Sequence, residues 1–137
     1  MKKMLFSALL LTGSFVAGAQ NQPDVHTLTV NVADLKTTSG AVYISLQDPT
    51  RKAVQRQAVP VQSTSAHIVF QNVPSGTYAV RLFHDENNNK VMDTGIFGIP
   101  KEGWGCSNNV KPSFGPPKYE AMLFTVKSSK AITIHIN

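Results

Sequence analysis

An all-β fold is predicted by three features of this 137-residue sequence. Apolar residues alternate with a period of two in several short segments. No segment keeps the spacing of an amphipathic helix, and turn-forming residues separate the alternating segments. Six to seven short strands at this density are typical of an antiparallel β-sandwich of immunoglobulin-like or transthyretin-like type.

The first three strand candidates lie in the N-terminal half. Residues 26–35 (HTLTVNVADL) place Leu and Val on one face and Thr and Asn on the other. Residues 41–48 (AVYISLQD) alternate between two largely apolar faces. A weaker candidate is QAVPVQ at 57–62, where Pro60 lacks an N–H and restricts the segment to a sheet edge.

The next two candidates read as a β-hairpin. Residues 66–73 (AHIVFQNV) and 77–84 (TYAVRLFH) both alternate, and a short PSG segment joins them. Pro74 presets φ for the first turn position, and Gly76 tolerates the positive φ that closes a three-residue loop. The sequence therefore predicts that these two strands pair.

Two further alternating segments close the chain. They are MLFTV at 122–126 and AITIHIN at 131–137. Between residues 85 and 118 the sequence is rich in Gly and Pro, which predicts one long loop. Its apolar residues argue against disorder and favour a functional loop. They are Phe97, Ile99, Trp104 and Phe114.

The N-terminus has the three parts of a secretory signal peptide. Lys2 and Lys3 precede an apolar run at 4–11, which is too short to span a bilayer, and small residues occupy 17–19. Cleavage after Ala19 leaves residues 20–137 as a single domain. No later segment approaches the length of a membrane span, so a periplasmic or secreted location is expected.

Charge and cysteine content narrow the function classes. The chain has 13 Lys and Arg against 8 Asp and Glu, and the basic residues are scattered, which argues against nucleic-acid binding. The single cysteine, Cys106, excludes an internal disulfide and is interpreted as a small buried apolar residue.

The stretch DENNNKVMD at 85–93 is the candidate metal site. Asp85, Asn87, Asn89 and Asp93 occupy positions 1, 3, 5 and 9 of an EF-hand-like loop, and the carbonyl of Val91 occupies position 7. Oxygens at this spacing converge on Ca²⁺ when the loop is tightly curled. The alternative is an Asn-rich turn, because Asp and Asn bond to their own backbone.

The site departs from an EF-hand in two residues. Lys90 stands where the motif has glycine, and Ile96 stands where it has a bidentate glutamate. Glu102 or Asp48 is a candidate for a further carboxylate from elsewhere in the chain. Weak, millimolar calcium binding is the expectation.

Trp104 and Tyr119 are the candidate binding residues, because amphipathic rings contact sugars and peptides. The alternative is a small second core under the long loop. His84 is interpreted as a strand-end histidine bonded to backbone, and no serine, cysteine or histidine pattern predicts a catalytic centre.

The segment from Phe83 to Val126 resembles a secreted bacterial family known as domain-of-unknown-function family 2141. The resemblance rests on HDEN at 84–87, Asp93, GIPKEGWGCSNN at 98–109 and GPP at 115–117. It implies a small exported β-sandwich related in style to transthyretin-like and carboxypeptidase regulatory-like domains. The family has no assigned activity, and an aromatic or other apolar residue is expected at Cys106.

The sequence thus predicts an exported, non-enzymatic β-sandwich whose long loop is braced by Ca²⁺ and contacts a ligand. The ligand class is a glycan or a protein at the cell envelope. The alternatives are a calcium-dependent carbohydrate-binding module that uses Trp104 and a small periplasmic hydrolase.

Overall fold

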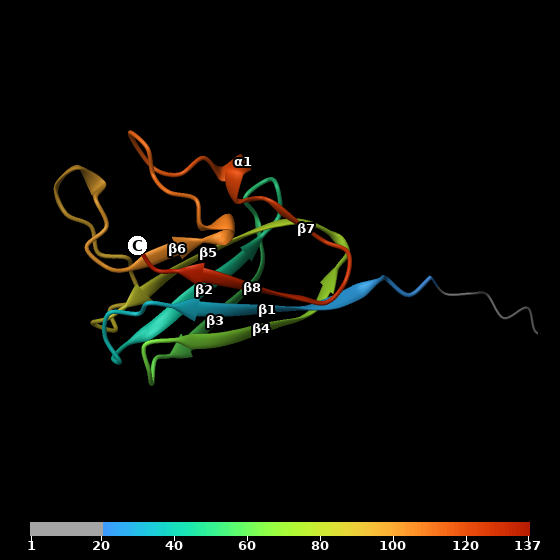
Figure 1. Cartoon of the computed structure of the whole chain (residues 1–137), viewed down its shortest axis with the longest axis horizontal. Coiled ribbons are helices and arrows are strands. Elements are labelled where there is room, and N and C mark those ends of the chain that lie inside the picture. The colour runs from blue at the N-terminus through green and yellow to red at the C-terminus, as the bar shows by residue number, and fades with distance from the viewer. Residues whose placement is uncertain (1–20) are drawn as a thin grey trace, which may run out of the picture.

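The computed structural model describes residues 21–137, which form two β-sheets packed face to face (Figure 1). The smaller sheet has the strand order β4-β1-β8, and the larger has the order β3-β2-β5-β6. The strands are β1 (Val25–Ala33), β2 (Ala41–Gln47), β3 (Ala53–Pro60), β4 (Ala66–Pro74), β5 (Gly76–Asp85), β6 (Trp104–Cys106), β7 (Phe124–Val126) and β8 (Lys130–His135). The predicted all-β sandwich is confirmed.

β1 is the central strand of the smaller sheet. It pairs antiparallel with β4 and parallel with β8, so the sandwich contains one parallel pair. Alternate residues of β1 point between the sheets, and Leu28, Val30 and Val32 are almost fully buried there. The side chains between the sheets form one continuous core, to which strands of both sheets contribute.

β2 and β5 are the inner strands of the larger sheet. Val42, Ile44 and Leu46 of β2 face the core, and the residues between them face outward. β3 lies at the sheet edge, as Pro60 predicted, but it begins at Ala53 and is longer than the predicted segment. β7 pairs with the beginning of β5.

The prediction that residues 66–73 and 77–84 pair as a β-hairpin is wrong. β4 and β5 follow one another in the chain but belong to different sheets, so the PSG segment carries the chain across the sandwich. Gly76 is not among the residues with positive φ, whereas Asn72, shortly before the turn, has φ 54°. Local turn signals identified the reversal correctly but do not determine which strand becomes the neighbour.

The predicted long loop contains short regular elements. It holds β6, which pairs with β5, and two 3₁₀ turns, η1 (Ile96–Gly98) and η2 (Ser107–Asn109). The helical turn α1 (Tyr119–Met122) comes directly after it, so Met122 is helical and not the first residue of the strand predicted at 122–126. The stretch therefore divides into a β5–β6 loop and a β6–α1 loop, which extend from one side of the sandwich (Figure 1).

The predicted signal peptide lies outside the described residues. Among residues 21–137, no helix has both the length and the apolar character that a membrane span requires.

Candidate functional site

The turn after β5 is organised by a buried carboxylate. Asp85 is fully buried, and its two oxygens accept hydrogen bonds from the backbone N–H groups of Asn89 and Lys90 at 3.2 and 2.8 Å. Lys90 has φ 65°, the left-handed conformation for which EF-hand loops use glycine at this position. The chain thus curls around Asp85 in spite of the missing glycine.

Asp93 joins the other polar side chains of the turn. Its carboxylate accepts hydrogen bonds from the carboxamide nitrogens of Asn87 at 2.6 Å and Asn89 at 2.9 Å. The carboxamide oxygens accept from the backbone: Asn87 Oδ1 from Asn89 N–H and Asn89 Oδ1 from Val91 N–H. The four predicted side chains therefore lie in one hydrogen-bonded cluster.

Glu102, which lies just before β6, connects both ends of this turn to that strand through hydrogen bonds. It is 8% exposed, and its two carboxylate oxygens accept the N–H groups of Glu86 and Asp93, each at 3.0 Å. These N–H groups lie at the beginning and the end of the turn, so one side chain holds both. The sequence suggested Glu102 as an extra calcium ligand, and the structure shows it bonded to backbone.

Asp48, the other suggested carboxylate, lies in a different part of the molecule. It organises the β2–β3 turn, where it accepts hydrogen bonds from the Thr50 hydroxyl and the N–H groups of Thr50 and Lys52. These bonds, the hydroxyl first, hold the pKa of Asp48 below its usual value. β2 pairs antiparallel with β5 so that Ala41 lies opposite Asp85, which places Asp48 beyond the other end of β2.

The capacity of the turn for a cation depends on the orientation of its amides. Asp85 and Asp93 supply two negative charges, but the amide nitrogens of Asn87 and Asn89 point at Asp93. A bound Ca²⁺ would need amide oxygens there instead, which a rotation of each carboxamide supplies. In the described chain, no three His, Cys, Asp or Glu side chains gather as a metal-binding group.

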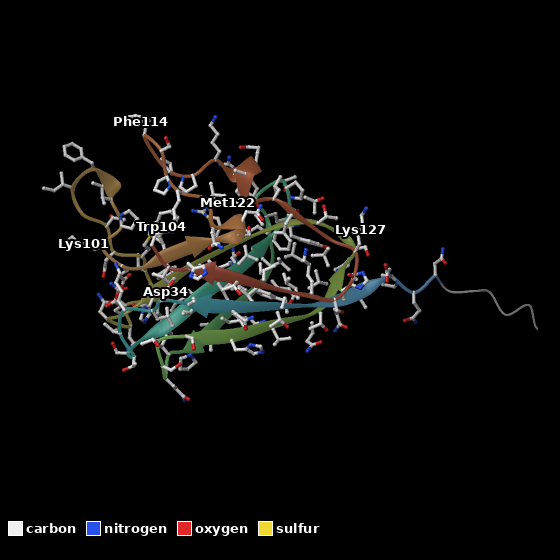
Figure 2. The ribbon with its side chains drawn as sticks, viewed as in Figure 1. Asp34, Lys101, Trp104, Phe114, Met122 and Lys127 are labelled. Atoms are coloured by element: carbon white, nitrogen blue, oxygen red, sulfur yellow. The ribbon has the colours of Figure 1, made fainter. Side chains whose placement is uncertain are left out.

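A large groove lies between the outer face of the larger sheet and the two loops. Its volume is about 1200 Å³, above the usual size of a small-molecule pocket. The floor comes from β2, β3, β5 and β6, and the walls come from the β5–β6 and β6–α1 loops. Trp104 lies between sheet and loops, whereas Phe114 projects from a loop tip (Figure 2).

One row of the groove floor is aromatic. Strand register aligns Tyr43 of β2 with Phe83 of β5, and Phe83 with Trp104 of β6. The Tyr43 and Phe83 rings stack with their centroids 5.3 Å apart and their planes 13° from parallel. All three side chains are half-buried, so the row offers apolar surface to a ligand.

The neighbouring row is basic. Ser45 of β2 lies opposite Arg56 of β3 on one side and Arg81 of β5 on the other. Both arginines are exposed, and all three residues line the groove. Ser45 Oγ and the nearby Gln47 Oε1 are buried without a hydrogen-bond partner among the described residues.

Tyr119, the second predicted binding residue, reaches the same groove but is largely packed. It is 5% exposed, its hydroxyl donates to the Asp48 carbonyl at 2.6 Å, and the Arg51 guanidinium lies 4.9 Å above its ring centre. Burial, followed by the Asp48 charge, raises the pKa of Tyr119. The structure brings Trp104 and Tyr119 to one groove, with Trp104 the more accessible. Tyr119 also belongs to a small second core and Trp104 packs against it, so the alternative interpretation of these residues is confirmed as well.

Cys106 is buried, as predicted, in a small second core beneath the loops. Ala79, Tyr119 and Met122 pack with it, and its Sγ donates a weak hydrogen bond to the Val110 carbonyl at 3.7 Å. Burial raises the pKa of the Cys106 thiol. Cys106 therefore serves as a buried core residue beneath the groove.

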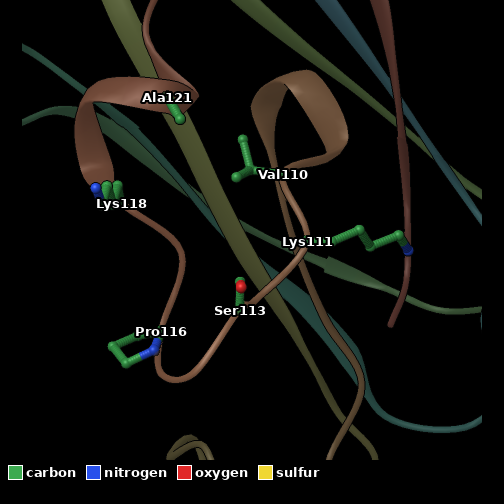
Figure 3. Close-up of a pocket in the computed structure, with 6 residues that line it drawn as sticks. All are labelled: Val110, Lys111, Ser113, Pro116, Lys118 and Ala121. Carbon is green, nitrogen blue, oxygen red and sulfur yellow. The ribbon is translucent and has the colours of Figure 1, made fainter.

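A smaller hollow lies beside the groove, between the β6–α1 loop and the start of α1 (Figure 3). Its volume is about 200 Å³, below the usual range for ligand pockets. It is lined by Val110, Lys111, Ser113, Pro116, Lys118 and Ala121. Pro116 also lines the large groove, so we treat this hollow as an extension of it.

Two histidines bear on the hydrolase alternative. His84 is buried and its Nε2 lies 2.7 Å from the Ser39 carbonyl, which confirms the predicted backbone bond. His26 Nε2 lies 2.7 Å from Ser75 Oγ, a contact that the sequence did not predict. The same Nε2 also contacts Asp24, and Ser75 Oγ donates to that carboxylate. A catalytic triad instead places the carboxylate on the other ring nitrogen.

Comparisons with known proteins place the chain in a family without naming an activity. No curated protein and no solved structure matches it. A family described as "Uncharacterized protein conserved in bacteria (DUF2141)" matches residues 30–135. This match spans most of the chain and nearly all of the described sandwich, from β1 to the end of β8. The chain belongs to this bacterial family of uncharacterised proteins.

Proposed function

We propose that this protein is an exported, non-enzymatic binding domain that holds a carbohydrate in the groove between the larger sheet and the two loops. The observation that carries the proposal is the aromatic row of Tyr43, Phe83 and Trp104 on the groove floor. The apolar faces of sugar rings pack on such surfaces, and the polar rim of the groove can bond to sugar hydroxyls.

The size and shape of the groove favour an extended ligand. A volume of about 1200 Å³ exceeds what one small molecule fills, and the groove is bounded by two separate loops. The row of aromatic side chains crosses three adjacent strands, so an extended ligand contacts apolar surface along its length. An oligosaccharide satisfies both requirements.

A non-enzymatic role is supported by the chemistry of the groove. Cys106 is buried with a raised thiol pKa, which disfavours the reactive thiolate. Ser45, the serine on the groove floor, lies between two arginines and has no histidine opposite it in the sheet. Export is supported by the basic, apolar and small-residue segments of residues 1–19.

Calcium is proposed as a brace for the β5–β6 loop, bound by Asp85, Asn87, Asn89, Asp93 and the carbonyl of Val91. The support is the curled turn, which gathers the four side chains, and the left-handed Lys90 at the position of the EF-hand glycine. This loop leads through Glu102 into Trp104, so bracing it would hold one wall of the groove.

The binding proposal is tested on a glycan array with the wild-type protein and Trp104→Ala. We expect wild-type binding that Trp104→Ala reduces by about tenfold or more, since hot-spot aromatic residues typically carry such losses. Phe114→Ala is the matched control, because Phe114 is a fully exposed aromatic that does not line the groove. Circular dichroism of each variant checks that the fold is retained.

If no glycan binds, or if both variants lose binding equally, the groove does not act as proposed. Turnover of an ester or glycoside that depends on Ser75 and His26 would instead support the hydrolase alternative.

A further inference from the structure

We propose that the carbohydrate is acidic, and that Arg56 and Arg81 bind its carboxylates. This inference rests on the proposed function and specifies the ligand class. It comes from the basic row of the groove floor, which lies next to the aromatic row.

The two arginines form a pair with defined spacing. Arg56 and Arg81 lie on β3 and β5, each directly opposite Ser45 of the strand between them. Adjacent strands are about 4.8 Å apart, so the backbones that carry the two guanidinium groups are separated by roughly 10 Å. Ser45 is small, which leaves room above β2 for a ligand group that both arginines reach.

The positive charge of the pair is not neutralised by the protein. The ion pairs of residues 21–137 are His26–Asp24, Arg51–Glu120 and His135–Asp34, and none of them includes Arg56 or Arg81. Glu102 is the acidic residue that lines the groove, and its oxygens already accept two backbone N–H groups. Lys36 and Lys101 line the groove as well, so its charge is complementary to an anion.

The position of the pair beside the aromatic row selects the kind of anion. Arg81 and Phe83 are two residues apart on β5, and Ser45 and Tyr43 are two apart on β2, which is about 7 Å along each strand. A ligand that fits both rows has a flat apolar face and a carboxylate within that distance. A uronic acid, a sugar ring with a carboxylate on its rim, has both, and guanidinium groups bind carboxylates through paired hydrogen bonds.

The test uses a galacturonic acid hexasaccharide and the same hexasaccharide with methyl-esterified carboxylates. The two probes share one backbone and differ in charge. Binding of each is measured by isothermal titration calorimetry to the wild-type protein, to Arg56→Gln/Arg81→Gln and to Trp104→Ala. Lys127→Gln is the matched control, because Lys127 is an exposed base at the other end of the sandwich and does not line the groove (Figure 2).

We expect the acidic hexasaccharide to bind the wild-type protein and the Lys127→Gln variant with equal affinity. The double arginine variant should lose about tenfold or more of that affinity, because two charge-assisted contacts are removed. Wild-type affinity for the ester should be similarly reduced, and added salt should weaken binding of the acid more than binding of the ester.

Two outcomes overturn the inference and are distinguishable. If acid and ester bind equally and only Trp104→Ala weakens them, the groove binds carbohydrate but not through charge, and the proposed function stands. If neither hexasaccharide binds while polyglutamate binds in an arginine-dependent way, the ligand is an acidic peptide, and both proposals fail.

Discussion

At the scale of single residues, Glu102 joins the two ends of the polar turn in the candidate site. It lies 16 positions after Glu86 and nine after Asp93, yet its buried carboxylate accepts the N–H groups of both. The spacing of the Asp and Asn residues predicted the turn, because those contacts are local. No local pattern connects Glu102 to the two ends of the turn, since this contact exists only after β6 has paired with β5.

Replacing Glu102 with Gln should destabilise the protein by about 1–3 kcal/mol, because the amide group places an N–H₂ against one of the two backbone donors. Urea unfolding measures the loss. Glu120→Gln is the matched control: Glu120 is 76% exposed and pairs with Arg51 at 3.9 Å, so its loss should cost less than about 1 kcal/mol. Equal effects of the two substitutions would show that the Glu102 contacts contribute little.

At the scale of elements, alternation predicted every strand of the described residues except β6. β1, β2, β4, β5 and β8 all lie within two residues of the predicted segments, because each contributes apolar side chains at alternate positions to the core. β6 has three residues, Trp104, Gly105 and Cys106, which is too few to show a period. It is a strand because β5 offers a free edge, and a single sequence window contains no information about that edge.

The groove was only partly predictable for a related reason. Trp104 and Tyr119 were identified as binding residues from their chemistry, and both line it. Arg81 and Tyr43 read as outward residues of separate strands. Arg56 precedes the predicted segment 57–62 and reads as part of a solvated basic loop, which is wrong because it lies in β3. Only the register of β2 with β3 and β5 makes the three residues neighbours. The failed hairpin prediction has the same cause, because strand order is a property of the whole sandwich.

The connection between β1 and β2 passes close to the end of β5 at Gly40. Gly40 has φ +78°, and a Cβ at this position would lie 1.9 Å from the Asp85 carbonyl oxygen. Gly40→Ala should therefore destabilise the protein by more than about 2 kcal/mol, because conformational strain adds to a clash with backbone. Thermal unfolding measures the change.

The substitution Gly98→Ala separates conformational strain from the clash with backbone. Gly98 has a similar φ of +69°, but nothing lies within 4 Å of its missing Cβ. This substitution should destabilise the protein only through conformational strain, by roughly 1 kcal/mol. If the two variants unfold at the same temperature, the close approach of Gly40 to Asp85 has no energetic consequence.

At the scale of the whole molecule, one continuous path joins the polar turn to the groove. The turn starts at buried Asp85, the last residue of β5, and returns through Glu102 to Trp104, the first residue of β6. β5 also carries Phe83 and Arg81 on the groove floor. Whatever fixes the turn therefore fixes the loop that forms one wall of the groove.

Calcium bound in this turn should stabilise the folded protein. An ion that binds only the native state adds a free energy that rises with the logarithm of one plus the ratio of its concentration to Kd. With Kd near 1 mM, 10 mM Ca²⁺ should add about 1.4 kcal/mol, which raises Tm by a few degrees. Magnesium should raise Tm less, because it releases its waters reluctantly and requires a strict octahedron.

The control must separate the ion from the hydrogen bonds that the same carboxylates make. Asp85→Asn/Asp93→Asn removes both charges but also weakens contacts to Asn87, Asn89 and Lys90, so its Tm falls with or without the ion. The diagnostic quantity is the difference in Tm between 10 mM Ca²⁺ and chelator, which this variant should lose. Asp48→Asn perturbs a similar Asp-centred turn at the other end of β2 and should keep the difference. A wild-type Tm that is equal in both solutions would mean that the hydrogen bonds of Asp85, Asp93 and Glu102 brace the loop without a metal.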